Sequence, residues 1–442
     1  MNQDFSTPKS MSIYELYEAF KAGKLHLRPI RSGKKNSFQR WQWWALKKKI
    51  YLIHSIYEKT TLPPIYLYKG GPNKGHYYIV DGQQRLSALF EFLEDYLDDK
   101  DPKKSRRSAI RLTQKGMMEN DKETLDEELE GKRWLDLTQD QQDDLGTYEL
   151  RVEELVRPRG MDEDDFDTRV RKFFHRINVT SGGMSEQEVR NNTYAGDLTD
   201  LLFSLQNTLG FCPPGPLSVT MDPKKLGESY FFTQNRICSS TDLLRMEDMD
   251  LTLSLLHAIH VNKWGEKVVE KEKDANGVPT GRLVTKRYFM PHKASTVDSF
   301  HKDHESLSAE QTSWLSESFL KDIGVFTSLA GLNLFDLGGS RFRKKNDFFG
   351  LFVAIERKRV ATGFDATNFD VLASNLTRFG EAVGLAEDGT LQSSTEFSLR
   401  VKALAQGYYD NIKENWSLRP QRETRVKVLL EILEMKRYFY NC

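Results

Sequence analysis

The segment from Tyr77 to Leu93 constrains the fold of this chain more than any other. Tyr77-Tyr78-Ile79-Val80 is a run of aromatic and β-branched residues, which is typical of a buried strand. Asp81-Gly82 follows, and apolar residues then recur at helical spacing, at Leu86, Leu89, Phe90 and Leu93. The sequence therefore predicts a strand that passes directly into a helix.

This junction has the chemistry of an anion-binding site. The first N–H groups of a helix have no intrahelical acceptor and lie at the positive end of the helix dipole. Gly82 lets the backbone approach a ligand closely, and Gln83 and Gln84 add amide donors and acceptors. Arg85 adds a planar guanidinium that suits phosphate. Because the dipole contributes only about 0.3–1 kcal/mol at an exposed site, Arg85 is expected to supply much of the binding.

Asp81 needs a separate interpretation, because a carboxylate repels phosphate. It either caps the helix, which is worth about 1 kcal/mol, or acts on the ligand. In the second case it binds a Mg²⁺ ion that bridges the phosphates, or it positions a water molecule for attack on them. Spacing alone favours the cap.

Length and composition predict two domains in an α+β protein. Single cores stop growing well below 442 residues, so we expect one domain at 1–210 and a mainly helical one at 221–442. The 64 basic and 64 acidic residues balance, and this total gives no reason to expect a nucleic-acid or membrane partner. Three widely spaced cysteines argue against a disulfide framework and a zinc site. A reducing cytoplasm, no signal peptide and no membrane helix are expected.

The run Asp81-Gly82-Gln83-Gln84-Arg85, within Tyr78 to Leu89, resembles the signature of the N-terminal domain of GmrSD-type modification-dependent restriction systems. Other blocks resemble the same family and occur in its order, namely residues 37–43, 131–137, 148–150, 174–178, 182–183 and 185–191. Together they cover roughly residues 10 to 200. Chance does not explain so many ordered matches.

The resemblance implies a fold, an activity and a set of site residues. The family's domain is similar to the ParB and sulfiredoxin superfamily, so a small mixed sheet flanked by helices is expected. Its strand-to-helix turn binds nucleotide phosphates, which implies a nucleoside triphosphate and Mg²⁺ as cofactors. The implied catalytic residues are Asp81, Gln84 and Arg85, and the implied nucleotide-binding residues are Gln39, Arg40, Gly82 and Gln83. In members that restrict DNA, this activity is coupled to sensing modified DNA.

The stretch from Lys21 to Lys49 carries only basic ionisable groups apart from one histidine. Interleaved with aromatic residues, it suits DNA binding, because lysines neutralise phosphates and aromatic rings stack on bases. The candidate contacts are Lys34, Lys35, Lys47 and Lys48. A solvated helix face above a buried aromatic core explains the pattern equally well.

The C-terminal half lacks the His-Asn-His pattern of the nuclease that follows this domain in many family members. His257 and His260 lie in an apolar helical stretch, where packing is favoured over metal binding. The run from His301 to Glu305 is charged, and we expect it to be exposed rather than to hold a metal. A partner, such as a separate nuclease or another defence-system protein, or a different activity of the C-terminal half would then have to replace that nuclease module.

The sequence therefore predicts a DNA-sensing NTPase of a prokaryotic restriction or anti-phage defence system. Two alternatives remain open: a nucleotide-dependent DNA-binding module without turnover, and a metal-dependent nuclease that uses Asp81 and Glu188 as ligands. The phosphate-binding role depends on an Arg85 that faces solvent. An Arg85 held in a buried ion pair would leave only the fold assignment.

Overall fold

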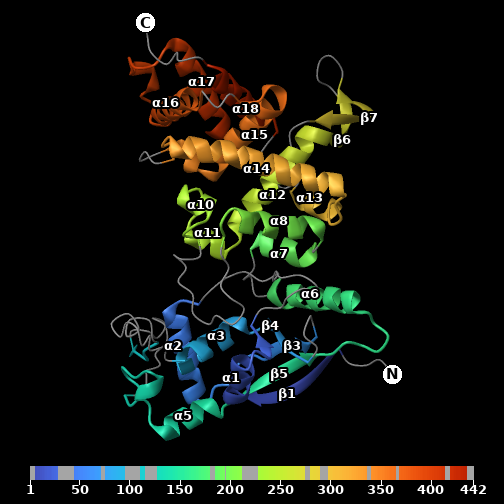
Figure 1. Cartoon of the computed structure of the whole chain (residues 1–442), viewed down its shortest axis with the longest axis vertical. Coiled ribbons are helices and arrows are strands. Elements are labelled where there is room, and N and C mark those ends of the chain that lie inside the picture. Colours follow the sequence, from blue (N-terminus) through green and yellow to red (C-terminus); the bar gives the residue numbers. More distant parts are fainter. Residues whose placement is uncertain are drawn as a thin grey trace. The chain divides into compact units, whose positions relative to one another are not determined.

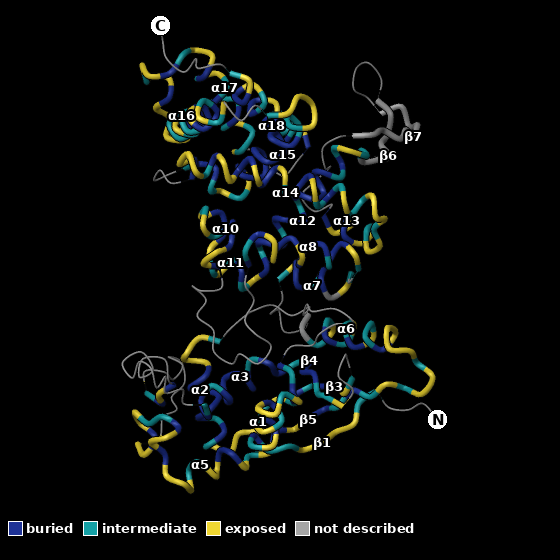
Figure 2. The backbone as a smooth tube through the Cα atoms, in the orientation of Figure 1, coloured by how far each residue is buried: buried dark blue, intermediate teal, exposed yellow. Residues whose placement is uncertain are grey.

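A computed structural model describes residues 5–27, 44–70, 75–94, 110–114, 127–179, 185–194, 196–211, 227–273, 279–288, 297–335, 340–364, 368–413 and 419–435. These residues separate into two compact units, the first ending at Thr193 and the second beginning at Tyr194. Each unit has its own buried core, drawn in dark blue in Figure 2.

The first unit is built on a mixed five-stranded sheet with the strand order β1-β5-β3-β4-β2. β1 is antiparallel to β5, β5 is parallel to β3, β3 is antiparallel to β4, and β4 is parallel to β2. The strands are β1 (Ser6–Ser12), β2 (Leu25–His26), β3 (Ile65–Lys69), β4 (Tyr77–Asp81) and β5 (Glu149–Leu155). The helices are α1 (Ile13–Lys21), α2 (Leu46–Tyr57), α3 (Gln83–Glu94), α5 (Gln139–Gly146), α6 (Glu163–Val179) and α7 (Glu186–Thr193).

Helices cover both faces of this sheet (Figure 1), because its strands alternate apolar residues between two cores. In β4, Ile79 packs into the core that also contains residues of α1, α2 and α3. Its neighbours Tyr78 and Val80 point to the opposite core, together with Phe166 and Val170 of α6. A sheet buried on both faces explains why the predicted strand reads as a continuous apolar run.

Most predicted elements of this unit are confirmed. The capping box at the start of α1 is present, with Ser12 accepting from the Glu15 N–H and Glu15 accepting from the Ser12 N–H. The junction between β4 and α3 lies where the sequence places it. Apolar residues recur at helical spacing up to Tyr57, and the helix that they form, α2, begins at Leu46 in the described residues.

Two strands were not predicted. β1 has mostly exposed residues and no apolar alternation, so its sequence carries no strand signal. It is held by its backbone pairing with β5 along seven residues and by contacts such as the Ser10 hydroxyl to the Glu149 carboxylate, 2.6 Å. β2 is only two residues long. Edge strands of this kind depend on partners distant in sequence.

The second unit is mainly helical in its described residues, as predicted. Its helices are α8 (Asp197–Thr208), α10 (Phe231–Gln234), α11 (Ser240–Leu244), α12 (Glu247–Trp264), α13 (Val297–Asp303), α14 (Ala309–Gly331), α15 (Lys345–Thr362), α16 (Phe369–Glu387), α17 (Leu399–Lys413) and α18 (Arg419–Glu434). β6 (Glu266–Lys273) and β7 (Pro279–Tyr288) form an antiparallel pair, and residues 274–278 between them lie outside the description. α12 and α15 are buried on nearly all sides, which explains the continuous apolar character of their sequences.

The described residues therefore form an α+β protein with one small mixed sheet and a large share of helix, and the predicted fold class is confirmed. Among them, no helix combines the length and the apolar character needed to cross a membrane.

Candidate phosphate site at the start of helix α3

Gly82 connects β4 to α3 in a backbone conformation that other residues rarely adopt. Its φ is +98°, and its carbonyl accepts the first helical hydrogen bond, from the Leu86 N–H at 3.0 Å. A Cβ atom here would lie 2.3 Å from Cδ1 of Ile65. Glycine is therefore required both by its φ and by the close packing of β3. The side of Gly82 that lacks a Cβ atom is occupied by the side chain of Ile65.

Arg85 does not present its guanidinium to solvent, whereas the sequence predicts that this group binds phosphate. The residue is 9% exposed, and Nη1 donates to the Pro63 carbonyl. Nη2 donates to the Pro64 carbonyl and to Oδ2 of Asp81, both at 3.0 Å. Burial lowers the pKa of Arg85, while the Asp81 carboxylate opposes that shift. The reason is geometric: Asp81 lies one helical turn before Arg85, and the carbonyls that precede β3 need donors.

The side chain of Asp81 remains partly exposed to solvent. Its side chain is 35% exposed and forms an ion pair with Arg85 at 3.0 Å. The helix cap favoured by spacing is not among its described contacts, because Gly82 takes the capping position. Arg85 thus fixes the direction of a carboxylate that remains accessible at the end of β4.

The two glutamines of the motif differ. Gln83 is 7% exposed, and its buried Nε2 has no hydrogen-bond partner in the described part of the chain. Gln84 is half-buried, and its Oε1 accepts from the Trp44 backbone N–H at 3.1 Å. The start of α2 is therefore tied to the start of α3. Buried N–H groups normally donate a hydrogen bond, so the Nε2 group of Gln83 is expected to find an acceptor in a ligand or a water molecule.

The other predicted ligand contacts are only partly within the description. Gln39 and Arg40, expected at the nucleotide, and Lys34 and Lys35, expected at DNA, lie outside the described residues. Lys47 and Lys48 are exposed in the first turn of α2, which contains no acidic residue. Neighbouring Lys49 is instead buried and pairs with Glu91.

A metal centre built only from protein ligands is absent from the described ranges. They contain no group of three or more His, Cys, Asp or Glu residues positioned to hold a metal ion. Glu188 is 3% exposed on α7, and its N–H donates to the Ser185 hydroxyl at 3.2 Å, as in a helix N-cap. A Mg²⁺ ion at Asp81 would need most of its ligands from phosphate and water, as Mg²⁺ commonly has.

His257 of the second unit is packed, as predicted, but the expectation that residues 301–305 are exposed is wrong for His301. His301 is fully buried, and its Nε2 lies 2.8 Å from the Thr199 hydroxyl. His257 is 4% exposed and stacks on Phe300 with 4.6 Å between ring centroids. Burial, with the nearby His260 next in effect, lowers the pKa of His257 to about 3.

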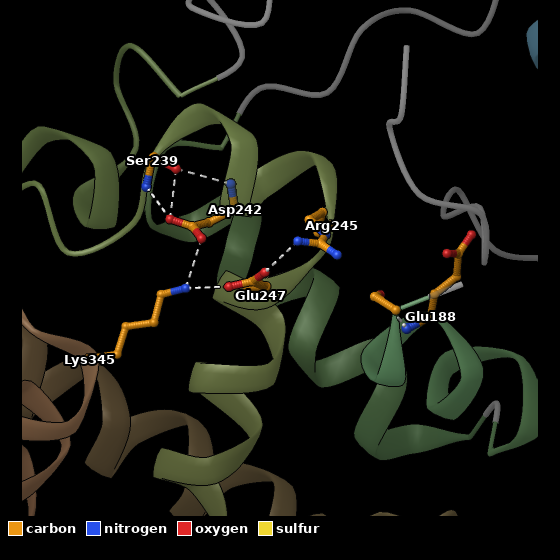
Figure 3. Close-up of polar contacts among 7 residues, drawn as sticks. Glu188, Ser239, Asp242, Arg245, Glu247 and Lys345 are labelled. Atoms are coloured by element: carbon orange, nitrogen blue, oxygen red, sulfur yellow. Dashed lines mark hydrogen bonds and ion pairs between the residues drawn. The ribbon is translucent and has the colours of Figure 1, made fainter. Parts of the chain in front are cut away.

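Sequence reasoning missed a polar network in the second unit (Figure 3). Ser239 caps α11 in a capping box with Asp242, and the Lys345 ammonium bridges Asp242 at 2.9 Å and Glu247 at 2.6 Å. Burial alone would raise the pKa of Asp242, but hydrogen bonds from Ser239 and Lys345 lower it to about 2. The network ties the start of α15 to α11 and α12. Only the Ser239 capping pattern could have been found in the sequence.

Residues 23–195, less than half of the chain, match the family model of the GmrSD restriction endonuclease, N-terminal domain. This segment is similar to the GmrSD-type N-terminal domain. The suspected resemblance is confirmed over these residues, and the match includes the whole junction from β4 to α3. It indicates a protein of a restriction or defence system. No curated protein and no solved structure matches the chain.

Proposed function

We propose that the GmrSD-type domain binds and hydrolyses a nucleoside triphosphate at the start of α3, as the sensing component of a prokaryotic restriction or anti-phage system that acts on DNA. The observation that carries the proposal is the pair formed by Gly82 and Gln83. The positive φ of Gly82 lets β4 pass directly into the helix, and the buried amide of Gln83 beside it has a donor with no described partner. Both features suit an anionic ligand.

The burial of Arg85 changes the roles of the site residues. The phosphates would be held by backbone N–H groups of the first turn of α3 and by the Gln83 amide, and not by the guanidinium of Arg85. Arg85 acts as a positioning residue, because its contacts fix Asp81 and the turn before β3. Asp81 would orient a Mg²⁺ ion or the attacking water. Arg85 is held in a buried ion pair, the arrangement that removes the phosphate role inferred for it from the sequence. The proposal therefore depends on two other observations, the Gln83 donor without a described partner and the family match.

A second candidate, nucleotide-dependent DNA binding without turnover, is favoured by the same arginine. A hydrolytic site usually offers a cation to the charge that develops on the phosphates, and Arg85 is engaged elsewhere. A nuclease that uses Asp81 and Glu188 has less support, because the described residues contain no cluster of metal ligands.

Phosphate release and nucleotide binding by the full-length protein separate these candidates. The protein is incubated with Mg²⁺ and each of the common nucleoside triphosphates, with and without DNA. Asp81→Asn should reduce phosphate release by roughly 100-fold or more and leave nucleotide affinity within a few-fold. Gln83→Leu, which preserves volume but removes the donor, should weaken binding about tenfold. Asp144→Asn, at an exposed position of α5, is the matched control.

Binding without release would select the second candidate, and cleavage of supercoiled plasmid with Mg²⁺ or Mn²⁺ would select the nuclease. Absence of both binding and release under all conditions would exclude the nucleotide site.

A further inference from the structure

Two histidines that are 44 positions apart in the chain meet in the second unit. His260 lies on α12, and His304 directly follows α13. Their Nε2 atoms are 3.0 Å apart, their ring centroids are 4.4 Å apart, and the ring planes cross at 72°. The sequence favoured packing for His260 and exposure for His304, whereas the fold brings these two ring nitrogens together.

The hydrogen bonds of His304 determine which nitrogen carries its proton. Nδ1 lies 2.9 Å from the Phe300 carbonyl, which can only accept, so Nδ1 carries the hydrogen. Nε2 of His304 therefore presents a lone pair to His260. A ring N–H held by a backbone carbonyl is also the arrangement that orients a metal-binding histidine.

The geometry of the pair differs from that of a simple imidazole hydrogen bond. His26 and His76 of the first unit provide that comparison: their nitrogens are 2.9 Å apart, but their centroids are 5.2 Å apart and their planes differ by 17°. Those rings meet head to head. The rings of His260 and His304 are closer and crossed, so their nitrogens converge. With metal–nitrogen bonds of about 2.1 Å, two nitrogens at a right angle lie about 3 Å apart.

We propose that His260 and His304 form a binding site for Cu²⁺ or Ni²⁺, with water completing the coordination. Imidazole nitrogens suit these ions, and a right angle between ligands fits tetragonal and octahedral geometry better than tetrahedral. The described residues supply no group of three protein ligands, so an exchangeable ion is expected. Its effect is to join the end of α13 to α12, independently of the nucleotide site.

The surroundings of the pair supply a spectroscopic reporter. The His260 ring lies 4.7 Å from the Trp264 ring, between centroids. A bound Cu²⁺ ion would thus quench the fluorescence of that tryptophan.

The test uses the untagged full-length protein with Ni²⁺ and Cu²⁺ as probes. Calorimetry should give one site, and His260→Gln and His304→Gln should each weaken it at least tenfold. His175→Gln, which changes a partly exposed histidine of α6, should have no effect. Trp264→Phe should preserve binding and remove the site's share of the Cu²⁺ quenching. Electron paramagnetic resonance of the Cu²⁺ form should show two nitrogen ligands.

Failure of the wild-type protein to bind either ion at micromolar concentration would overturn the proposal. Undiminished binding in both glutamine variants, or its loss in His26→Gln, would place any metal elsewhere and overturn it as well. If His260→Gln does not fold, the His304→Gln and Trp264→Phe variants still decide the question. None of these results depends on nucleotide hydrolysis.

Discussion

Replacement of Gly82 by alanine should strongly destabilise the first unit, and the structure gives two separable reasons. The φ of +98° disfavours any residue with a Cβ, at a cost of about 1–3 kcal/mol. The new Cβ would also lie 2.3 Å from Cδ1 of Ile65, and such overpacking typically costs about 1–3 kcal/mol. The expected total for Gly82→Ala is therefore roughly 2–6 kcal/mol.

Ile65→Val separates these two contributions, because valine lacks the Cδ1 atom that the alanine would meet. Ile65 is fully buried, so this change alone should cost about 0.5–1.5 kcal/mol. In the double variant the steric part disappears and the strain in φ remains. The double variant should then be more stable than the sum of the two single changes predicts, by about 1–3 kcal/mol.

The assay is hydrogen exchange of peptides that cover β4 and α3 in the full-length protein, which reports the local opening free energy. Nucleotide binding is measured in parallel, and the proposed site predicts that Gly82→Ala loses it. A Gly82→Ala variant within about 0.5 kcal/mol of the wild type would refute the requirement for glycine. Strict additivity in the double variant would refute the clash with Ile65.

Glu356 is buried, and burial raises its pKa from 4.5 to about 7, so stability contributed by its protonated form is lost as the pH rises through that interval. In urea unfolding, Glu356→Gln should stabilise the second unit by up to about 3 kcal/mol above pH 7 and have little effect near pH 4.5. The control Glu434→Gln, at an exposed position, should change the unfolding free energy at neither pH. Arg85→Lys keeps the charge but loses the fork, and hydrogen exchange should reveal a loss of about 1–3 kcal/mol around β3; wild-type exchange would contradict the positioning role. If Lys48 contacts DNA phosphate, Lys48→Ala should reduce the slope of log affinity against log salt by about 1, and an unchanged slope would remove it from the DNA surface.

The local parts of the site could be predicted from the sequence. A strand and a helix each carry their own period, so the junction at Gly82 follows from the residues on either side of it. The N-caps at Ser12 and Ser185 were predictable for the same reason, since a cap involves residues only three positions apart. In each case the decisive contacts lie within one helical turn or one strand.

The two carbonyl groups that bind Arg85 could not be predicted, because they come from a distant part of the chain. Pro63 and Pro64 lie 22 and 21 positions before it, and no sequence period connects a carbonyl to a guanidinium over that distance. The meeting of His260 with His304 depends in the same way on how α12 and α13 pack. Local chemistry indicated which groups could bind a ligand, whereas tertiary structure determined which of them remain available.

The first strand and helix of the chain have a practical consequence for anyone who isolates the domain. The family match begins at residue 23, yet β1 and α1 precede it and contribute Ile13, Leu16 and Phe20, all at most 2% exposed, to the main core. A fragment cut at the edges of the homology would therefore lose an edge strand and three core side chains. The segment that matches the family model is therefore shorter than the segment that forms the folded core. Expression of residues 23–195 alone should yield a polypeptide that aggregates.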